Sequence, residues 1–143
     1  MTIAEVTSAL EAFAPLALQE DYDNCGLQVG NRSAECHGAL LCVDVTPAIV
    51  DEAVARGCNL IVSHHPLIFK GLKRITGATQ VERVVLKAIS NNIAIYSCHT
   101  AVDNATNGVS WEMARRLNVI NVETLEPQQG KLLKLSFMVP MAH

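Results

Sequence analysis

Three short apolar runs, separated by segments with helical character, constrain the fold more than any other feature of this sequence. They cover Ala39–Val43, Asn59–Val62 and Ile93–Ser97. Strands that are covered on both faces read as continuous apolar runs, because neither face meets water. Strands that alternate with helices are typical of a parallel sheet. We therefore predict an α/β fold, a three-layer αβα arrangement around a mostly parallel sheet.

Helix start and stop signals fill the intervals between these runs. Thr2 with Glu5, and Thr79 with Glu82, have the spacing of capping boxes. The predicted helices begin after Thr2, Thr46 and Thr79 and near Val109, and they end before Pro15, Gly57 and Asn91 and near Leu117. The stretch between Cys98 and Gly108 is predicted to be a loop. Gly26–Gly30 is predicted to be a short strand or a tight turn.

The end of the sequence has a different pattern. Leu133, Leu135, Phe137 and Val139 are apolar at every second position, which predicts a half-buried strand. This strand does not fit the block of continuous apolar strands. We interpret it as an edge strand or as the start of an inserted domain.

Composition limits both the surface and the partners. Apolar residues make up 50% of the chain and charged residues only 17%, against about 25% charged in ordinary soluble domains. Such a chain is globular rather than disordered, and part of its surface should be covered by a second domain, a subunit or further chain. We therefore expect a homo-oligomer. A net charge of −3 and few aromatic side chains argue against nucleic-acid binding.

Other features bear on location and on ligands. No apolar run reaches the length of a membrane span, and the first residues lack the pattern of a signal peptide. The cysteines, five in number without a Cys-x-x-Cys pair, are typical of reduced thiols in a cytoplasmic protein. Residues 61–90 carry five basic side chains and one acidic one. This segment either attracts a small anionic ligand or is simply a solvated surface.

Histidines and carboxylates follow the predicted strands. Asp44 comes after the first run, His64 and His65 after the second, and His99 and Asp103 after the third. The carboxyl ends of parallel strands form the usual ligand site, and imidazole with carboxylate suits divalent metals. Successive side chains on a strand point apart, so His64 and His65 are expected to serve two neighbouring ions. One of the two is expected within metal-bridging reach of Asp103.

Each of these residues also has a simpler interpretation. His64 and His65 could bond to the backbone, Asp103 could cap a helix, and Asp44 could satisfy loop amides. His99 could support a metal ligand rather than be one. Cys98 is interpreted as an inert buried thiol rather than a nucleophile.

Three motifs together carry a family resemblance. The segments 23–30 (DNCGLQVG), 63–75 (SHHPLIFKGLKRI) and 96–103 (YSCHTAVD) resemble those of the NGG-interacting-factor-like proteins, whose bacterial members are named GTP cyclohydrolase type 2 homologues. The resemblance runs from about Ile3 to the end of the chain.

The resemblance implies a dinuclear metal site, with two divalent ions per full-length subunit, in a ring-shaped, hexameric homo-oligomer. It places metal ligands at His64, His65 and Asp103 and a catalytic histidine at His99. The family completes its site with a histidine and a glutamate near its C-terminus. The resemblance therefore gives residues 1–130 as an N-terminal α/β metal-binding domain and 131–143 as a strand leading towards a middle and C-terminal region.

Two functions are compatible with these features. The first is a metal-dependent hydrolase that acts on a nucleotide-like phosphorylated substrate, with Lys70, Lys73 and Arg74 holding the anionic end. The second is a non-catalytic metal-binding scaffold or regulatory interaction protein. Zinc, iron, manganese, cobalt and nickel all suit such ligands. Because the implied ligands are divided between two ions, we expect the 143-residue chain alone to bind metal weakly and to lack turnover.

Overall fold

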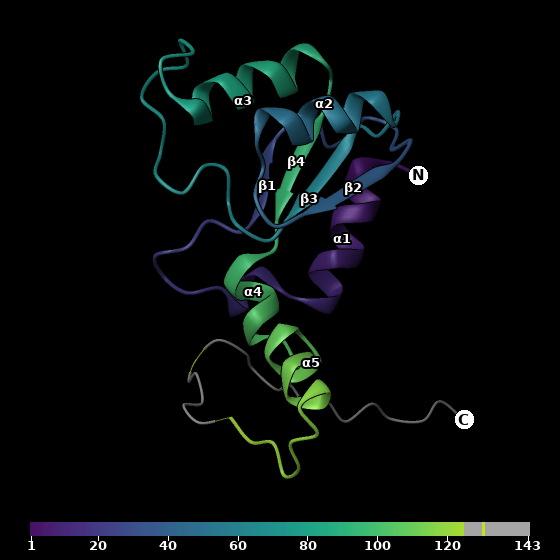
Figure 1. Ribbon diagram of the computed structural model, residues 1–143, viewed down its shortest axis with the longest axis vertical. Coiled ribbons are helices and arrows are strands. Elements are labelled where there is room, and N and C mark those ends of the chain that lie inside the picture. Colours follow the sequence, from purple (N-terminus) through teal and green to yellow (C-terminus); the bar gives the residue numbers. More distant parts are fainter. Residues whose placement is uncertain (125–129, 131–143) are drawn as a thin grey trace, which may run out of the picture.

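Four strands form one open sheet in the computed structural model, which describes residues 1–124 and 130 (Figure 1). The strands are β1 (Gly26–Val29), β2 (Ala39–Cys42), β3 (Leu60–Ser63) and β4 (Ala94–Ser97), in the order β1-β4-β3-β2. β2, β3 and β4 are parallel, and β1 pairs with β4 in the antiparallel sense. The predicted, mostly parallel sheet is confirmed. The segment that could have been a strand or a turn is an antiparallel edge strand.

The helices follow the predicted pattern with one exception. They are α1 (Ile3–Phe13), the 3₁₀ turn η1 (Leu16–Leu18), α2 (Pro47–Ala55), α3 (Gln80–Ser90), α4 (His99–Asn104) and α5 (Val109–Arg116). The prediction of a loop between Cys98 and Gly108 is wrong, because α4 occupies part of it. α4 has only six residues, and its N-cap, Cys98, makes no side-chain capping bond. It therefore lacks the capping signal that marks the starts of α1, α2 and α3.

The capping residues explain where three helices begin. At α1 the Thr2 side chain accepts from the Glu5 amide and the Glu5 carboxylate accepts from the Thr2 amide, so the box is complete. At α2 the Thr46 side chain caps the first turn. At α3 Thr79 accepts from the Glu82 amide. The Glu82 carboxylate turns instead to the residues before the helix, so only half of the second box forms.

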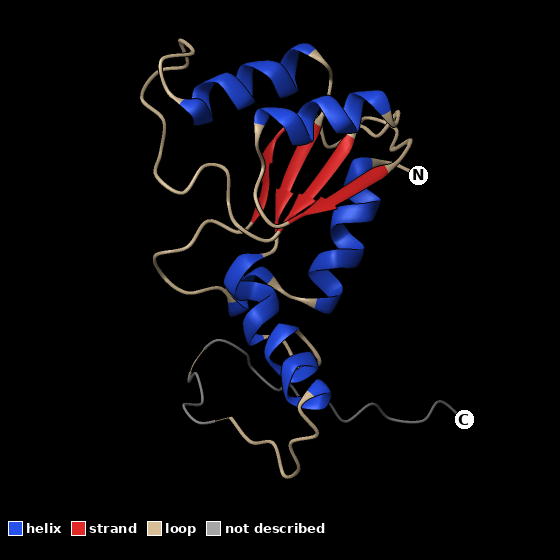
Figure 2. Ribbon diagram, in the orientation of Figure 1, coloured by secondary structure: helices blue, strands red, loops and turns tan. Residues whose placement is uncertain are grey.

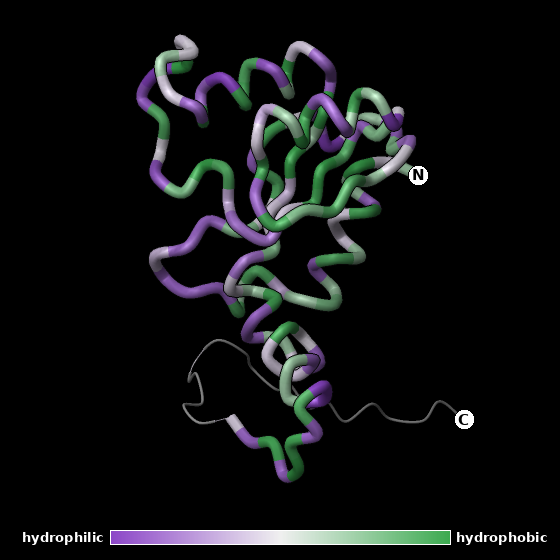
Figure 3. The backbone as a smooth tube through the Cα atoms, in the orientation of Figure 1, coloured by the Kyte–Doolittle hydropathy of each residue, from purple (hydrophilic) through white to green (hydrophobic). Residues whose placement is uncertain are grey.

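Helices cover both faces of the sheet, which gives the predicted three layers (Figure 2). Ile61 and Ile95 point to the face where α2 and α3 supply Val50, Val84 and other core residues. Alternate residues of the same strands, including Leu60 and Tyr96, pack with Ile3 of α1 on the other face. The central strands are apolar along their length, as Figure 3 shows, because both of their faces are buried.

The edge strand β2 is covered on one face only. Leu41 and Val43 are 78% and 59% exposed, whereas Leu40 and Cys42 pack against the core beneath α2. α5 contributes no buried residue. Some of the residues behind the high apolar content of the sequence therefore lie at the surface of the described chain. The alternating segment 131–143, and with it the predicted domain boundary, lies outside the described residues.

In residues 1–124 and 130, no helix is long and apolar enough to cross a membrane. All five cysteines have free thiols.

Candidate metal centre

The histidines lie at the carboxyl edge of the sheet, where β3 and β4 end. His64 and His65 follow β3 directly, and His99 opens α4 just after β4. Backbone bonds continue the sheet past the strand ends, since the His65 amide donates to the Val43 carbonyl and the His99 amide donates to the His64 carbonyl, both at 2.9 Å. This ladder brings two sequence motifs together at one point.

Two buried serine hydroxyls donate hydrogen bonds to the backbone carbonyls of His64 and His65. The Ser63 hydroxyl donates to the His65 carbonyl at 2.8 Å, and the Ser97 hydroxyl donates to the His64 carbonyl at 2.9 Å. Both serines are 1% exposed or less. A buried hydroxyl bonded in this way fixes the backbone from which the imidazoles project.

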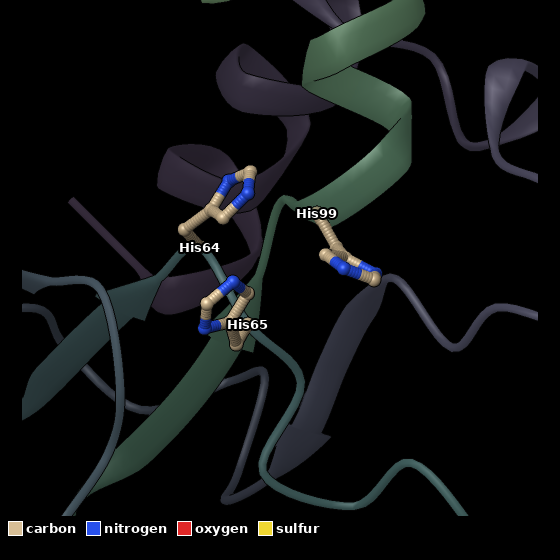
Figure 4. A group of neighbouring side chains, drawn as sticks. All are labelled: His64, His65 and His99. Carbon is tan, nitrogen blue, oxygen red and sulfur yellow. The ribbon is translucent and has the colours of Figure 1, made fainter.

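The three imidazole rings converge on one space (Figure 4). The ring centroids are 4.9 Å apart for His64 and His65, 5.5 Å for His64 and His99, and 5.7 Å for His65 and His99. The expectation that neighbouring His64 and His65 point apart is wrong. Side chains alternate only in extended strand, and β3 ends at Ser63, after which the chain bends at both histidines.

Carboxylates accompany each of the three rings. The Nδ1 atom of His65 lies 2.8 Å from Asp44 Oδ1, and the Nδ1 atom of His99 lies 2.8 Å from Asp23 Oδ1. The sequence left open that Asp44 bonds to loop amides. In the structure its carboxylate bonds to a histidine. A carboxylate on one ring nitrogen leaves the other nitrogen free to bind a metal.

Asp103 is close to His64, as expected. Its Oδ2 atom lies 3.9 Å from His64 Nε2. Asp103 follows His99 by four residues within α4, and residues with this spacing lie on the same face of a helix. One short helix thus presents both a histidine and a carboxylate to the site.

The three histidines fit a divalent ion. One ligand atom from each lies within 4.8 Å of the others, and two ligands of one tetrahedral zinc-type ion, each at about 2.1 Å, lie about 3.4 Å apart. The rings therefore need to close by up to about 1.4 Å to share one ion. The set also has three protein ligands, as catalytic zinc sites do. Weak metal binding by the 143-residue chain was expected because His64 and His65 were assigned to two different ions. In this geometry both histidines face the same space, so that assumption no longer holds.

Asp23 is the most deeply buried acid of the site. Its side chain is 0% exposed. Burial alone would raise its pKa, but hydrogen bonds from Thr100, His99, Cys25 and the Asn24 amide outweigh burial and hold the pKa well below its usual range. The carboxylate is therefore charged at neutral pH.

The two thiols near the site are not nucleophiles. Burial, with the nearby Asp23 carboxylate, raises the pKa of Cys25 to about 12. Burial also raises the pKa of Cys98, which agrees with its interpretation as an inert thiol. A thiol reacts as its thiolate, and neither residue forms one at neutral pH.

The basic segment begins beside the histidines. The ring centroid of Phe69 lies 6.3 Å from that of His99, and the ring centroid of Tyr22 lies 6.4 Å from that of Phe69. Two polar side chains of the 23–30 motif hold this stretch, since Asn24 Nδ2 donates to the Ile68 carbonyl at 2.6 Å and Gln28 Oε1 accepts from the Ile68 amide at 2.9 Å.

The predicted anion-binding side chains follow directly. Lys70, Lys73 and Arg74 are exposed, and none forms a salt bridge with any residue that the structure describes. The structure brings the start of this segment to the histidines and leaves its charges free for an anion.

Sequence reasoning missed Asp23, Asn24, Gln28 and Phe69. The first three belong to the 23–30 motif, whose specific run of residues was recognisable. Their roles were not, because their partners lie 40 residues or more away along the chain.

Known proteins resemble this chain along most of its length. The chain is 39% identical over 110 residues to a GTP cyclohydrolase 1 type 2 homolog from Clostridium acetobutylicum, covering 77% of this chain and 41% of the relative. It is 41% identical over 129 residues to NIF3-like protein 1 from Drosophila melanogaster, covering 90% of this chain and 44% of the relative. The chain thus spans less than half the length of these relatives.

The fold and the family agree with these matches. A crystal structure of a Bacillus cereus protein related to NIF3 superposes with a TM-score of 0.83 at 39% identity, over 90% of this chain and 35% of that one. The sequence model of the family Duf34/NIF3 (NGG1p interacting factor 3) matches residues 1–142. The chain therefore belongs to the Duf34/NIF3 family.

Proposed function

We propose that this protein is a metal-dependent hydrolase that acts on a nucleotide-like, phosphorylated substrate. The observation that carries the proposal is the convergence of His64, His65 and His99 on one space at the carboxyl edge of the sheet. The name of the Clostridium relative, a GTP cyclohydrolase 1 type 2 homolog, supports the substrate class.

The metal ligands follow from the geometry and from the resemblance. His64, His65 and His99 would hold one divalent ion, and Asp103 supplies a carboxylate for the second ion that the resemblance implies. We assign His99 to the metal rather than to a separate catalytic role, because its ligand atom lies with those of the other two histidines. Divalent ions in such a site activate water and polarise a substrate oxygen.

The remaining residues would bind and orient the substrate. Lys70, Lys73 and Arg74 would bind its phosphate groups through charge-assisted hydrogen bonds. Phe69 offers an aromatic ring beside His99, which suits the flat ring of a nucleobase. The free thiols agree with a protein that works in the reducing cytoplasm.

The test is hydrolysis of nucleoside triphosphates, GTP first, by protein of the full family length, loaded with Zn²⁺ or Mn²⁺. His65→Ala should lower kcat/KM by at least about 100-fold, since even changes behind a ligand cost 10–100-fold. His37→Ala is the matched control, because His37 is exposed and lies in a pocket away from the three histidines. It should leave turnover unchanged.

Two outcomes would contradict the proposal. If the wild-type protein binds metal but hydrolyses no nucleotide, the scaffold interpretation replaces it. If His65→Ala and His37→Ala are equally active, the histidine cluster is not the active site.

A further inference from the structure

The long connection between β3 and α3, residues 64–79, contains neither helix nor strand. Figure 1 shows it as a loop that runs from the carboxyl edge of the sheet to the start of α3. Connections of this length without secondary structure of their own are uncommon in compact domains and usually serve function. The placement of Lys70, Lys73 and Arg74 therefore depends on what holds this connection.

Two amide side chains hold the connection near its start, at Ile68. Asn24 Nδ2 donates to the Ile68 carbonyl at 2.6 Å, and Gln28 Oε1 accepts from the Ile68 amide at 2.9 Å. Gln28 Nε2 donates to the Asn24 carbonyl at 2.6 Å, which closes the three residues into one hydrogen-bonded ring. An amide side chain offers both a donor and an acceptor, so this residue type suits a site that must satisfy both backbone groups of one residue.

A β-bulge in β1 sets the place of Gln28. Leu27 pairs with Tyr96 and Val29 pairs with Ile95, so Gln28 is the extra residue between two consecutive pairs of the ladder. Bulges re-aim side chains and are frequent next to active sites. The bulge therefore releases Gln28 from the regular pairing, and its side chain bonds to the connection instead.

The far end of the connection is held as well. The Glu82 carboxylate accepts from the Thr76 amide at 2.8 Å and from the Ala78 amide at 3.1 Å. Between the two anchors, residues 69–75 make no hydrogen bond with any residue that the structure describes. Their placement therefore follows from the anchors and from Leu72, which packs against the core.

The first anchor immediately precedes the part of the connection that lies beside the histidines. Phe69 follows Ile68, and its ring centroid lies 6.3 Å from that of His99. Lys70 is the next residue. Holding both backbone groups of Ile68 therefore fixes the aromatic ring and the point from which the cations extend. Lysine and arginine bind phosphate through charge-assisted hydrogen bonds, whose strength depends on this placement.

We infer that Asn24 and Gln28 are positioning residues, which hold the start of the connection so that its cations meet the phosphate groups of a nucleotide. The two amides thereby set the preference for a phosphorylated ligand over an unphosphorylated one. The binding of phosphate rests on the proposed function, whereas the anchoring of Ile68 does not depend on it.

The first test needs no nucleotide. Hydrogen exchange, followed by mass spectrometry of peptides that contain Ile68, measures how firmly the connection is held in protein of the full family length. Gln28→Met keeps the approximate size of the side chain and removes both of its hydrogen bonds. It should speed exchange at Ile68 by about 10-fold, the effect expected from two lost hydrogen bonds.

Asn59→Leu is the matched control, because Asn59 makes the same pair of bonds elsewhere. Its Oδ1 atom accepts from the His37 amide at 2.8 Å, and its Nδ2 atom donates to the Glu35 carbonyl at 2.7 Å. Asn59 is half-buried, as Gln28 is, and it precedes β3, whereas the histidines follow the strand ends. The change should leave exchange at Ile68 as it is in the wild type.

The second test compares the affinities for GTP and for guanosine, which lacks phosphate groups. Rapid-mixing binding of their fluorescent derivatives, followed before turnover in Mn²⁺-loaded protein of the full family length, gives both affinities. Gln28→Met should weaken GTP binding by roughly 10-fold, as loss of a hydrogen bond to a charged group does, and leave guanosine binding unchanged. Asn24→Ala, at an exposed position, should act in the same way, and Asn59→Leu should change neither affinity.

Three results would overturn the inference. If Gln28→Met changes exchange at Ile68 no more than Asn59→Leu does, the two amides do not anchor the connection. If exchange becomes faster but GTP binds as tightly as before, or GTP and guanosine weaken equally, the positioning role fails and the proposed function stands. If the wild type binds GTP no more tightly than guanosine, the cations do not meet phosphate, whatever the hydrolysis test of the proposed function shows.

Discussion

His64, His65, His99 and Asp103 were identifiable from the sequence because each follows a recognisable apolar strand. The topology of a parallel sheet then brings those strand ends to one edge, where the structure has them. Asp23 could not be identified in this way. Its contact with His99 depends on how the loop before β1 folds back onto α4, and no periodic pattern encodes a loop path.

The side chain of Glu82 has a second role, which its capping-box spacing from Thr79 did not predict. Its carboxylate accepts from the Thr76 amide and hydroxyl, each at 2.8 Å, and from the Ala78 amide at 3.1 Å. Hydrogen bonds from the Thr76 amide and hydroxyl, with smaller ones from Ala78 and Thr79, lower the pKa of Glu82 to about 2. Through these hydrogen bonds the ionised Glu82 carboxylate links the end of the basic segment to α3.

This arrangement predicts a pH dependence of stability. The folded pKa of Glu82 is lowered from an ordinary value of 4.5 to about 2, so on acidification the unfolded chain takes up the proton first. The stabilisation by Glu82 is complete above about pH 4.5 and declines as the pH falls towards 2. Urea unfolding of wild type and Glu82→Gln should differ most at pH 7 and converge near pH 2. A difference that stays constant over this range would contradict the assignment.

At the scale of elements, α4 and α5 meet at a junction that only glycine allows. Gly108 caps the start of α5, and a Cβ there would lie 1.8 Å from the Val102 carbonyl oxygen and 2.9 Å from that of Ala105. The sequence predicted the other helices from their caps and periodicity. It did not predict α4, because a helix of six residues is too short to show a period and is held by its contacts rather than by its own propensity.

Gly108→Ala should therefore destabilise the protein by about 2–3 kcal/mol, since the extra methyl group meets backbone that cannot move aside cheaply. Chemical unfolding followed by the fluorescence of Trp111, the single tryptophan, reports on α5 directly. Gly71→Ala is the control, because nothing lies within 4 Å of a Cβ at that position. Equal unfolding midpoints for the two variants would show that α4 and α5 are not packed as described.

At the scale of the whole molecule, the outer strand β2 is unusual for an edge. Natural proteins protect edge strands with charges, prolines or a covering element, but Ala39–Val43 contains neither a charge nor a proline. Its α1-side residues Leu41 and Val43 are exposed, although α1 covers the neighbouring strands β3 and β4 on that face. The low charged fraction of the sequence predicted that some apolar surface is covered by another domain or subunit. The composition could not show which residues form that surface, because this depends on which strand lies at the edge of the sheet.

We expect a second copy of the chain to cover β2, because an unprotected apolar edge that recurs on every copy can pair with itself. Sedimentation velocity at micromolar concentration should show an oligomer for the wild-type chain and a shift towards the monomer for Leu41→Glu, which places a charge on the exposed face. Ile120→Glu is the matched control, because Ile120 is 81% exposed, similar to the 78% of Leu41, but lies outside the sheet. It should leave the oligomer intact. A monomeric wild-type chain, or an equal loss of assembly in both variants, would show that β2 is not the contact surface.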